Sequence, residues 1–381
     1  MKITFVMASG FTLTGGDRVV ATYADYLHKR GHEVLVVSRP RQTRSFYERV
    51  RSLLKGKGWL PAEEKEASHF DHLEVPRRLI DSFRPVSDED LPDADVVIAT
   101  WWETAEWVNN LSPRKGAKAY FIQHHEVFDY LPKDKVEASY RLPLYKITIA
   151  QWLVDLMRTR YNDSDVALVP NSVDLTQFCA APRSRQQVPT IGMTYSTVLW
   201  KGCDISIKAF EIAAQTIPNL RLLAFGNHPP TPDLPLPAGT EFFFSPPQSK
   251  IRDLYATCDA WLFGSRIEGF GLPILEAMAC RTPVIGTPAG AAPELLENGA
   301  GLLVNFEDPE DMAKAIIRLY ELSEAEWKEM SDTAYKRVTA YTLDDATTLF
   351  ESALDAAIAR CQQSNQQIKF SESDRLNALN S

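Results

Sequence analysis

Hydrophobic positions in the first part of the chain alternate between short apolar runs and longer amphipathic stretches. The apolar run 2–8 is followed by residues 17–30, whose apolar side chains recur at helical spacing, and then by the apolar run 33–38. Strand, helix and strand in this order predict a parallel βαβ unit. The other elements predicted in this half are strands at 95–100, 117–123 and 166–170 and a long helix at 138–160.

The same alternation starts again at residue 190. Strands are predicted at 190–194, 220–225, 241–244, 260–263 and 283–286, and helices at 203–216, 308–322, 324–340 and 344–361. Strands that alternate with helices form mostly parallel sheets with helices on both faces. The sequence therefore predicts an α/β protein with two doubly wound, Rossmann-like domains and a cleft between them.

Breaks in composition suggest where these domains end. Residues 179–189 are polar and contain two prolines, which is typical of an interdomain linker. We therefore expect an N-terminal domain at 1–178, this linker, and a C-terminal domain at 190–342. A helix is predicted at 343–362, and one alternative is that it packs back on the N-terminal domain. The polar tail 363–381 is expected to fray.

Composition narrows the class of protein. The 381 residues are 45% hydrophobic and 24% charged with a net charge of −9, which disfavours disorder, coiled coils and bulk nucleic-acid binding. The five cysteines are scattered without a Cys-x-x-Cys pair, and no run of 18 apolar residues occurs. We expect a soluble, cytoplasmic protein with free thiols and no nucleic-acid partner.

Residues suited to ligand binding follow the predicted strands, where ligands of open parallel sheets bind. Seven such clusters are Gly15-Gly16, Trp101-Trp102-Glu103, His124-His125-Glu126, Lys201-Gly202, Gly226-Asn227-His228, Glu268–Gly271 and Gly286–Gly290. Because they fall on the carboxyl edges of both sheets, we expect them to converge on the cleft.

The sharpest of these segments is Ser265-Arg-Ile-Glu-Gly-Phe-Gly-Leu-Pro-Ile-Leu-Glu276. Its glycines allow close approach of a ligand, and a helix that starts near Pro273 favours an anion such as a diphosphate. Glu268 and Glu276 each offer two acceptor oxygens for adjacent hydroxyls. This combination suits a nucleotide-sugar, whereas Glu276 taken alone could simply charge the start of a helix without any ligand.

Residues 255–314 resemble the donor-binding domain of the retaining family 4 (group 1) glycosyltransferases, which have the GT-B fold. The motifs that carry the resemblance are Glu268-Gly-Phe-Gly-Leu-Pro with Glu276, Ala277-Met-Ala, Gly286-Thr-Pro-Ala-Gly-Ala-Ala-Pro-Glu294, Asn298-Gly and Gly301-Leu-Leu-Val. Val169-Pro-Asn-Ser-Val-Asp174 and Gly15-Gly16 resemble further motifs of this family, while residues 40–120 resemble it only weakly.

The resemblance implies roles for individual residues. Glu276 would bind the ribose, Lys201 the diphosphate, and Glu268 the donor sugar. One of His124 and His125 would lie near the transferred sugar, and we favour His124. The complete set expected to bind the donor is Gly15, Gly16, Lys201, Gly226, Arg266, Glu268, Gly269, Phe270, Gly271, Leu272 and Glu276; His124, Lys201 and Glu268 are the expected catalytic residues, and Trp101, Trp102 and His125 are expected on the acceptor side.

The implied reaction moves a hexose-type sugar from a nucleoside-diphosphate sugar, with retention and with no cofactor. Metal is not needed if Lys201 and the helix start stabilise the leaving diphosphate. Every Asp-x-Asp pair precedes a predicted strand, on the wrong edge for a metal at the cleft. A front-face route is favoured, because spacing assigns no carboxylate as nucleophile.

One departure from the family keeps other functions open. The family places an arginine five residues before the phosphate lysine, where this chain has Ser196. Arg266 could compensate for it. Otherwise the chain would be a catalytically silent nucleotide-sugar-binding protein, and a sugar epimerase or phosphorylase of the same architecture is a further alternative.

The acceptor is expected to be a glycan, a lipid-linked molecule or a small molecule. Basic residues from Arg39 to Lys57 are interleaved with apolar residues at helical spacing, which predicts either peripheral contact with an anionic membrane or a helix packed on the first domain with solvated charges.

Overall fold

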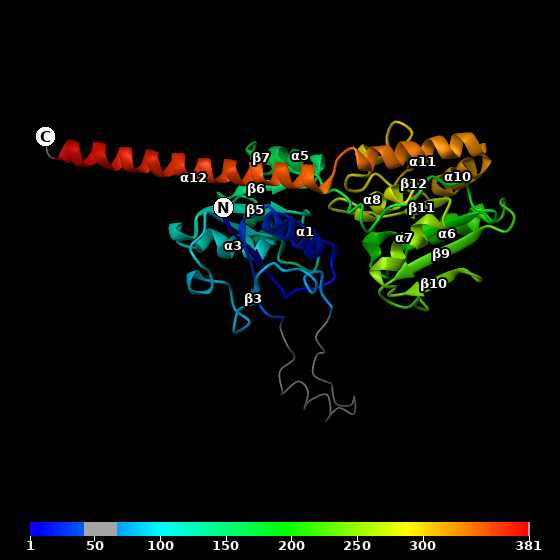
Figure 1. Ribbon diagram of the computed structural model, residues 1–381, viewed down its shortest axis with the longest axis horizontal. Helices are drawn as coiled ribbons and strands as arrows, with labels where there is room; N and C mark the ends of the chain where they lie inside the picture. Colours follow the sequence, from blue (N-terminus) through cyan, green and yellow to red (C-terminus); the bar gives the residue numbers. More distant parts are fainter. Residues whose placement is uncertain (42–66, 380–381) are drawn as a thin grey trace, which may run out of the picture. The chain divides into compact units, whose positions relative to one another are not determined.

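The computed structural model describes residues 1–41 and 67–379. The chain divides into two compact units (Figure 1). The first unit comprises Met1–Thr148, Val154–Val169 and Thr347–Ser381, and the second comprises Ile149–Leu153 and Pro170–Ala346. Each unit is built around one parallel sheet, so the predicted fold class is confirmed.

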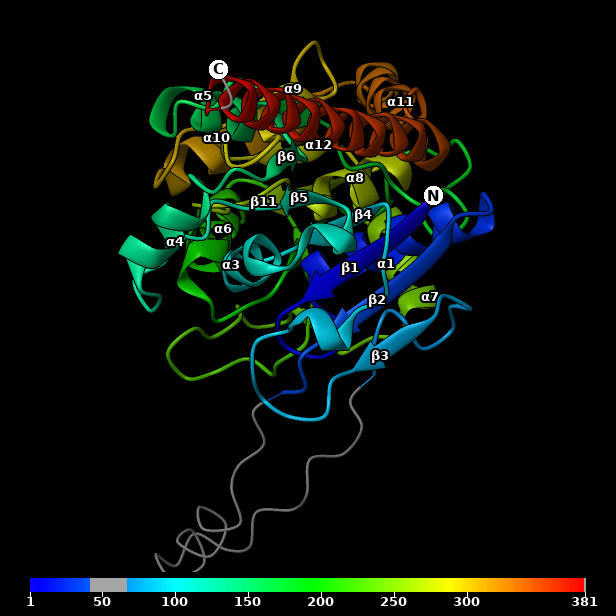
Figure 2. The ribbon, with the colours of Figure 1, turned by 90° about the vertical axis from the view of Figure 1, so that its left-hand side faces the viewer.

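The sheet of the first unit has the strand order β3-β2-β1-β4-β5-β6-β7. Its strands are β1 (Lys2–Met7), β2 (Glu33–Ser38), β3 (Arg77–Leu79), β4 (Val96–Ala99), β5 (Ala117–Ile122), β6 (Tyr145–Thr148) and β7 (Val166–Leu168). Figure 2 shows β1, β2 and β3 side by side at one end of this order. All residues of β4 and nearly all of β1 are buried, as in parallel sheets that are covered on both faces.

Helices complete the first unit: α1 (Gly15–Lys29), α3 (Trp102–Asn110), α4 (Lys133–Ser139), α5 (Gln151–Arg160) and α12 (Leu343–Leu379). The long C-terminal helix α12 packs within this unit, where the Phe350 ring stacks on Tyr23 with centroids 4.4 Å apart. Glu351 on the same helix pairs with Arg30 and His32. Beyond residue 362, where the tail was expected to fray, the structure describes a continuation of α12 to Leu379.

The sheet of the second unit has the strand order β10-β9-β8-β11-β12-β13. Its strands are β8 (Thr190–Thr194), β9 (Arg221–Gly226), β10 (Glu241–Phe244), β11 (Ala260–Phe263), β12 (Val284–Gly286) and β13 (Gly301–Leu303). Its helices are α6 (Cys203–Ala213), α7 (Gln248–Ala256), α8 (Leu272–Ala279), α9 (Ala292–Leu296), α10 (Pro309–Glu321) and α11 (Glu324–Thr339). Side-chain caps fix two helix starts: Asp308 accepts the Asp311 N–H at the start of α10, and Ser323 forms a capping box with Glu326 at the start of α11.

One predicted helix is wrong. Residues 138–160 form the end of α4, the strand β6 and the helix α5 rather than one long helix. Pro143 interrupts helical geometry, and the segment after it is rich in β-branched residues, which favour a strand. In that strand Tyr145 pairs with Ala119 of β5.

The main boundary between the two units in the sequence falls between Val169 and Pro170, earlier than the predicted boundary at 178. Residues 170–178 belong to the second unit, where the buried Phe178 ring packs edge-on against Tyr255 with centroids 6.2 Å apart. The predicted linker 179–189 also lies in the second unit. There Arg183 donates to the Cys258 carbonyl and to the Thr282 hydroxyl, which holds the segment against β11.

Within residues 1–41 and 67–379, no helix is both long enough and apolar enough to cross a membrane. Most of the basic segment from Arg39 to Lys57 lies outside the described residues. Arg39 itself is buried, pairs with Glu103 and lies over the Trp107 ring, so this end of the segment is part of the first unit's core.

Candidate active site

The loops after β8 and β11, which are neighbouring strands in the second unit, are fastened to each other. The backbone N–H of Arg266 donates to the Trp200 carbonyl at 2.8 Å. Gly202, with φ of +58°, lies so close to the opposite loop that a Cβ would stand 1.7 Å from the Gly264 oxygen. Glycine is therefore required there, and the contact sets Lys201 beside the loop that contains Glu268.

Lys201 and Glu268 form an ion pair at this edge of the sheet. Lys201 Nζ lies 2.7 Å from Glu268 Oε1, and the Ser265 hydroxyl donates to the same oxygen at 2.8 Å. The Glu268 side chain is 12% exposed and that of Lys201 41%. Neither of these two contacts uses the second carboxylate oxygen, Glu268 Oε2. The Lys201 ammonium group and this oxygen therefore lie close together at the edge of the sheet.

The segment Glu268–Gly271 leads directly into α8. Gly271 has φ of +103° at the N-cap, and Pro273 follows in the first turn. A second turn holds this segment in place, because the Ala291 N–H donates to the Phe270 carbonyl at 2.8 Å. Gly290 has φ of +62°, and a Cβ there would lie 2.5 Å from the Phe270 oxygen. Backbone packing thus defines the loop and the start of α8 together.

Glu276 projects from α8 into a largely buried position, with 7% of its surface exposed. The Tyr255 hydroxyl donates to Glu276 Oε2 at 2.8 Å, and Tyr255 itself is fully buried in α7. A buried carboxylate that is held by a fixed donor is preorganised to accept hydroxyls from a ligand. Tyr255 had no signal in the sequence, because it lies on a different helix with no motif spacing to Glu276.

Arg266 is occupied by protein groups. Its guanidinium donates to both oxygens of Asp204, both oxygens of Glu307 and the Leu199 carbonyl, which uses all five N–H donors. Hydrogen bonding to Asp204 and then to Glu307 raises the pKa of Arg266. In this structure Arg266 therefore offers no donor to a diphosphate, contrary to the expectation that it replaces the arginine missing at Ser196. It braces the Lys201 loop instead.

The remaining predicted donor residues of the second unit occupy the same edge. Gly226 ends β9, where a Cβ would lie 2.4 Å from the Tyr195 carbonyl oxygen, and Leu272 is the first residue of α8. Tyr195 is buried, and its hydroxyl donates to the Leu234 carbonyl, so this tyrosine fixes a loop rather than lining an open surface.

In the first unit, the glycine loop and the histidine loop are neighbours. Gly15 and Gly16 are the first residues of α1, which Thr14 caps through the Asp17 N–H. A Cβ on Gly16 would lie 3.8 Å from the Gln123 side-chain oxygen at the end of β5. The structure therefore brings together two clusters that the sequence places more than a hundred residues apart.

His124 and His125 have different surroundings. His125 Nε2 lies 2.7 Å from the Tyr161 hydroxyl, and its ring packs on Tyr140, whereas the His124 ring packs on Phe128. Burial, followed by the charge of Arg160, lowers the pKa of His125 to about 4. His125 is thus neutral at pH 7 and engaged with an aromatic cluster.

A buried tyrosine holds the backbone of the histidine loop. The Tyr140 hydroxyl accepts the Glu126 N–H at 2.8 Å and donates to the His124 carbonyl at 3.1 Å. Glu126 is 2% exposed, and burial raises the pKa of its carboxyl group well above the ordinary value. Nothing in the sequence pattern pointed to Tyr140.

The two tryptophans after β4 differ in burial. Trp102 is 8% exposed, and its backbone N–H donates to Glu126 Oε2 at 3.0 Å, so it starts α3 inside the core. Trp101 is half-buried at the N-cap of the same helix. Of the two, only Trp101 has surface for a ligand.

Four of the six aspartates in the Asp-x-Asp pairs have basic partners, whereas Asp88 accepts the Ser112 backbone N–H and Asp95 accepts the Lys2 backbone N–H. Asp90 pairs with Arg84, Asp93 with Arg114 and Lys115, Asp163 with Lys146, and Asp165 with Arg360. The hydrogen bond from Arg84 lowers the pKa of Asp90 to about 2. In the described part of the chain, no group of three or more His, Cys, Asp or Glu side chains has the arrangement of a metal site.

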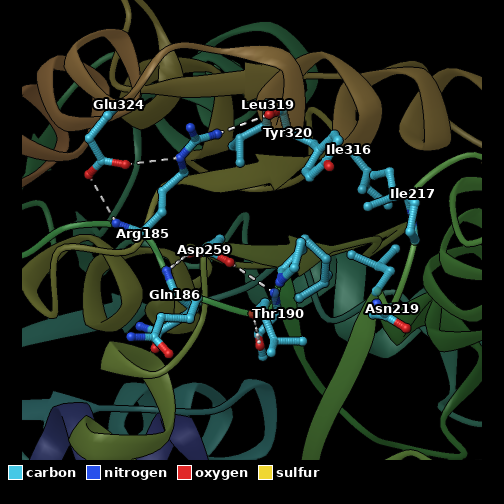
Figure 3. Close-up of a pocket in the computed structure, with 16 residues that line it drawn as sticks. Arg185, Gln186, Thr190, Ile217, Asn219, Asp259, Ile316, Leu319, Tyr320 and Glu324 are labelled. Carbon is cyan, nitrogen blue, oxygen red and sulfur yellow. Dashed lines mark hydrogen bonds and ion pairs between the residues drawn. The ribbon is translucent and has the colours of Figure 1, made fainter.

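Figure 3 shows a cavity of about 620 Å³ in the second unit. It is lined by Thr190 and Asp259 at the amino ends of β8 and β11, together with Tyr320 and the ion pair of Arg185 and Glu324. This is the edge of the sheet opposite the Lys201–Glu268 pair. Because ligands of open parallel sheets bind at the carboxyl edge, this cavity is not the candidate active site.

Two doubly wound parallel sheets with glycine loops at their carboxyl edges define the GT-B class of protein. Two family models match the chain: "Glycosyl transferases group 1" matches residues 180–337, and "Glycosyltransferase Family 4" matches residues 13–177. Together these matches extend over most of both units, and the chain belongs to the group 1, family 4 glycosyltransferases.

Solved structures show the same fold. Sucrose-phosphate synthase from Thermosynechococcus elongatus has a TM-score of 0.70 and 16% identity, covering 94% of this chain and 100% of the other. Anabaena Alr3699/HepE in complex with UDP has a TM-score of 0.71 and 16% identity, covering 93% and 100%. At these identities the likeness concerns the fold alone.

A curated relative is similar in sequence over a shorter stretch. This relative, a phosphatidylinositol N-acetylglucosaminyltransferase component from Arabidopsis thaliana, is 28% identical over 169 residues, which are 42% of this chain and 38% of the relative. The chain thus matches well under two thirds of that relative's length.

Proposed function

We propose that this chain transfers a hexose-type sugar from a nucleoside-diphosphate sugar to an acceptor, with retention of anomeric configuration and without a metal ion. The observation that carries the proposal is the carboxyl edge of the second sheet, where Lys201, Glu268 and the start of α8 lie together. A cation and helix N–H groups suit the diphosphate, and carboxylates suit the hydroxyls of the sugar and the ribose.

The leaving group gains negative charge as the glycosidic bond breaks. Lys201 and the N–H groups that begin α8 would stabilise that charge, because fixed donors aimed at developing charge lower the barrier. Glu276, held by Tyr255, would bind the ribose. The structures of Anabaena Alr3699/HepE with UDP and with UDP-glucose support a uridine nucleotide as the first donor to test.

In this proposal the first unit binds the acceptor. His124 is favoured over His125 as the residue near the transferred sugar, since the His125 ring is turned into the cluster of Tyr140 and Tyr161. Relatives named as a phosphatidylinositol N-acetylglucosaminyltransferase component and an O-antigen chain mannosyltransferase support a glycan or lipid-linked acceptor.

Thermal shift with a panel of nucleoside diphosphates tests the donor site. A ligand at about a hundred times its dissociation constant stabilises by about 2.7 kcal/mol, which raises the melting temperature by roughly 3 °C when a chain of 381 residues unfolds as one unit. Absence of any shift at millimolar nucleotide would refute the proposal. Release of nucleoside diphosphate in EDTA then tests metal independence, and trapping a covalent glycosyl-enzyme would contradict the front-face route.

One observation favours a second candidate, a catalytically silent nucleotide-sugar-binding protein. Ser196 replaces the family's arginine, and Arg266 has no N–H left to substitute for it. A thermal shift with no nucleotide released in the presence of sugar acceptors would favour this candidate. Turnover would exclude it.

A further inference from the structure

A tryptophan side chain holds the loop Glu268–Gly271, which we call the donor loop. The Trp152 indole N–H donates to the Gly269 carbonyl, with Nε1 and the oxygen 2.9 Å apart. Trp152 is the second residue of α5 and lies in the stretch Ile149–Leu153, which belongs to the second unit, as the donor loop does. The donor loop therefore has a side-chain anchor that is far from it in the sequence.

The backbone that carries this anchor is packed in the protein interior. Ile149, Ala150 and Leu153 are each 3% exposed or less, and the Leu153 N–H donates to the Ala150 carbonyl at 3.1 Å. The Trp152 side chain itself is half-buried. An indole on a tightly packed backbone has few alternative positions, so its N–H is a fixed donor.

Fixing the Gly269 carbonyl also fixes the N–H of the next residue. The Gly269 carbonyl and the Phe270 N–H belong to one planar trans peptide group, so they point in opposite directions. With the carbonyl held by Trp152, the Phe270 N–H is turned away from the indole. Within residues 1–41 and 67–379 this N–H has no hydrogen-bond acceptor, although Phe270 is 5% exposed. Unpaired N–H groups on buried residues are rare, and a ligand can supply the acceptor.

The glycine at position 269 gives the anchor its importance. A residue without a Cβ leaves its peptide groups free to rotate over a wide range. The Phe270 carbonyl accepts the Ala291 N–H at 2.8 Å, but that contact orients the next peptide group along the chain. The hydrogen bond from Trp152 is the contact that orients the peptide group between Gly269 and Phe270.

We propose that Trp152 is a positioning residue that directs the Phe270 N–H toward the sugar of a nucleoside-diphosphate sugar. This inference rests on the proposed function and adds a residue to it. An N–H that is already oriented donates to a sugar oxygen without the entropy cost of ordering its peptide group. A nucleoside diphosphate has no such sugar, so its binding through Glu276 and Lys201 does not depend on Trp152.

Trp152→Phe tests this role, because it removes the indole N–H and keeps an aromatic ring. Titration calorimetry with UDP and UDP-glucose, GDP and GDP-mannose, and ADP and ADP-glucose first identifies the pair that the wild-type chain binds most tightly. For that pair, Trp152→Phe should weaken binding of the sugar nucleotide roughly three- to tenfold, the size of one neutral hydrogen bond. Binding of the nucleoside diphosphate should change by less than about twofold. A merely structural role would not separate the two ligands.

Trp327→Phe is the matched control. The Trp327 indole N–H also donates to a backbone carbonyl, that of Asp259 at 3.0 Å, and its side chain is fully buried in α11. This variant loses the same kind of hydrogen bond at the amino edge of the second sheet. Its melting temperature should fall, while the ratio of the two affinities should stay within about twofold of the wild-type ratio.

Three outcomes would overturn the role of Trp152 and leave the donor site standing. They are an equal loss of affinity for both nucleotides in Trp152→Phe, an unchanged affinity for the sugar nucleotide in that variant, and the same separation of the two ligands in Trp327→Phe. A wild-type chain that binds none of these nucleotides at millimolar concentration would overturn both this inference and the proposed function.

Discussion

Glu276 gives the sharpest test of donor recognition. In Glu276→Gln the side chain keeps its shape and an oxygen that can accept the Tyr255 hydroxyl, so the fold should lose less than about 1 kcal/mol. The variant loses the charge that would strengthen hydrogen bonds from the ribose. A hydrogen bond to a charged group contributes about 1.5–3 kcal/mol and one to a neutral group about 0.5–1.5 kcal/mol, so loss of the charge should cost about 1–1.5 kcal/mol for each bond, which corresponds to a roughly 5- to 13-fold larger dissociation constant.

Isothermal titration with the nucleoside diphosphate that gives the largest thermal shift measures this effect. The 2′,3′-dideoxy form of the same nucleotide lacks the hydroxyls that Glu276 is proposed to bind. It should bind more weakly to the wild-type chain, and it should bind equally well to wild type and Glu276→Gln. Glu329→Gln, on the exposed side of α11, is the matched control.

Two results would refute this reasoning. Unchanged affinity of Glu276→Gln for the full nucleotide would show that the carboxylate does not touch the ribose. An equal loss for the full and the dideoxy nucleotide would show that Glu276 acts on another part of the ligand or on the fold.

Three further predictions concern the loops and the histidines. Gly202→Ala should lower the free energy of unfolding in urea by about 3 kcal/mol or more, because its Cβ would overlap a carbonyl oxygen; Gly239→Ala, with a similar positive φ and open space around it, should cost only about 1 kcal/mol, and equal losses would contradict the packing argument. Lys201→Met should lower kcat more than tenfold. Arg266→Met should change the free energy of unfolding by more than it changes the KM for the donor, when both changes are expressed in kcal/mol. A larger effect on the KM than on the free energy of unfolding would show that Arg266 contacts the diphosphate. The pKa of His125 is about 4 in the folded chain against an ordinary 6.5, so the unfolded chain binds the proton at a higher pH than the folded chain. The free energy of unfolding should therefore fall by about 1 kcal/mol as the pH drops from about 6.5 to 4. His125→Gln should flatten this part of the pH profile, and an unchanged slope in the variant would contradict the argument.

The strands were predictable because parallel sheets covered on both faces leave continuous apolar runs. The strands β2, β8, β10 and β11 have the bounds that these runs predict. Where the apolar run is short the prediction failed, as in β6, which was assigned to a helix, and in β3, which has only three residues and no buried one.

The candidate site was predictable only in part. Glycines that must approach another backbone closely, and carboxylates beside them, stand out in the sequence. The partners of those groups do not, since Tyr255 reaches Glu276 and Asp204 reaches Arg266 across tertiary contacts that no helical or strand period encodes. For this reason Arg266 was expected at the ligand, whereas its donors are used within the protein.

Hydrogen–deuterium exchange with and without the preferred nucleoside diphosphate tests most directly where the donor binds. The central claim predicts protection of peptides that cover 199–203 and 264–276, at the carboxyl edge of the second sheet. Protection confined to 185–190, 217–220 and 316–324, which surround the cavity in Figure 3, would contradict it.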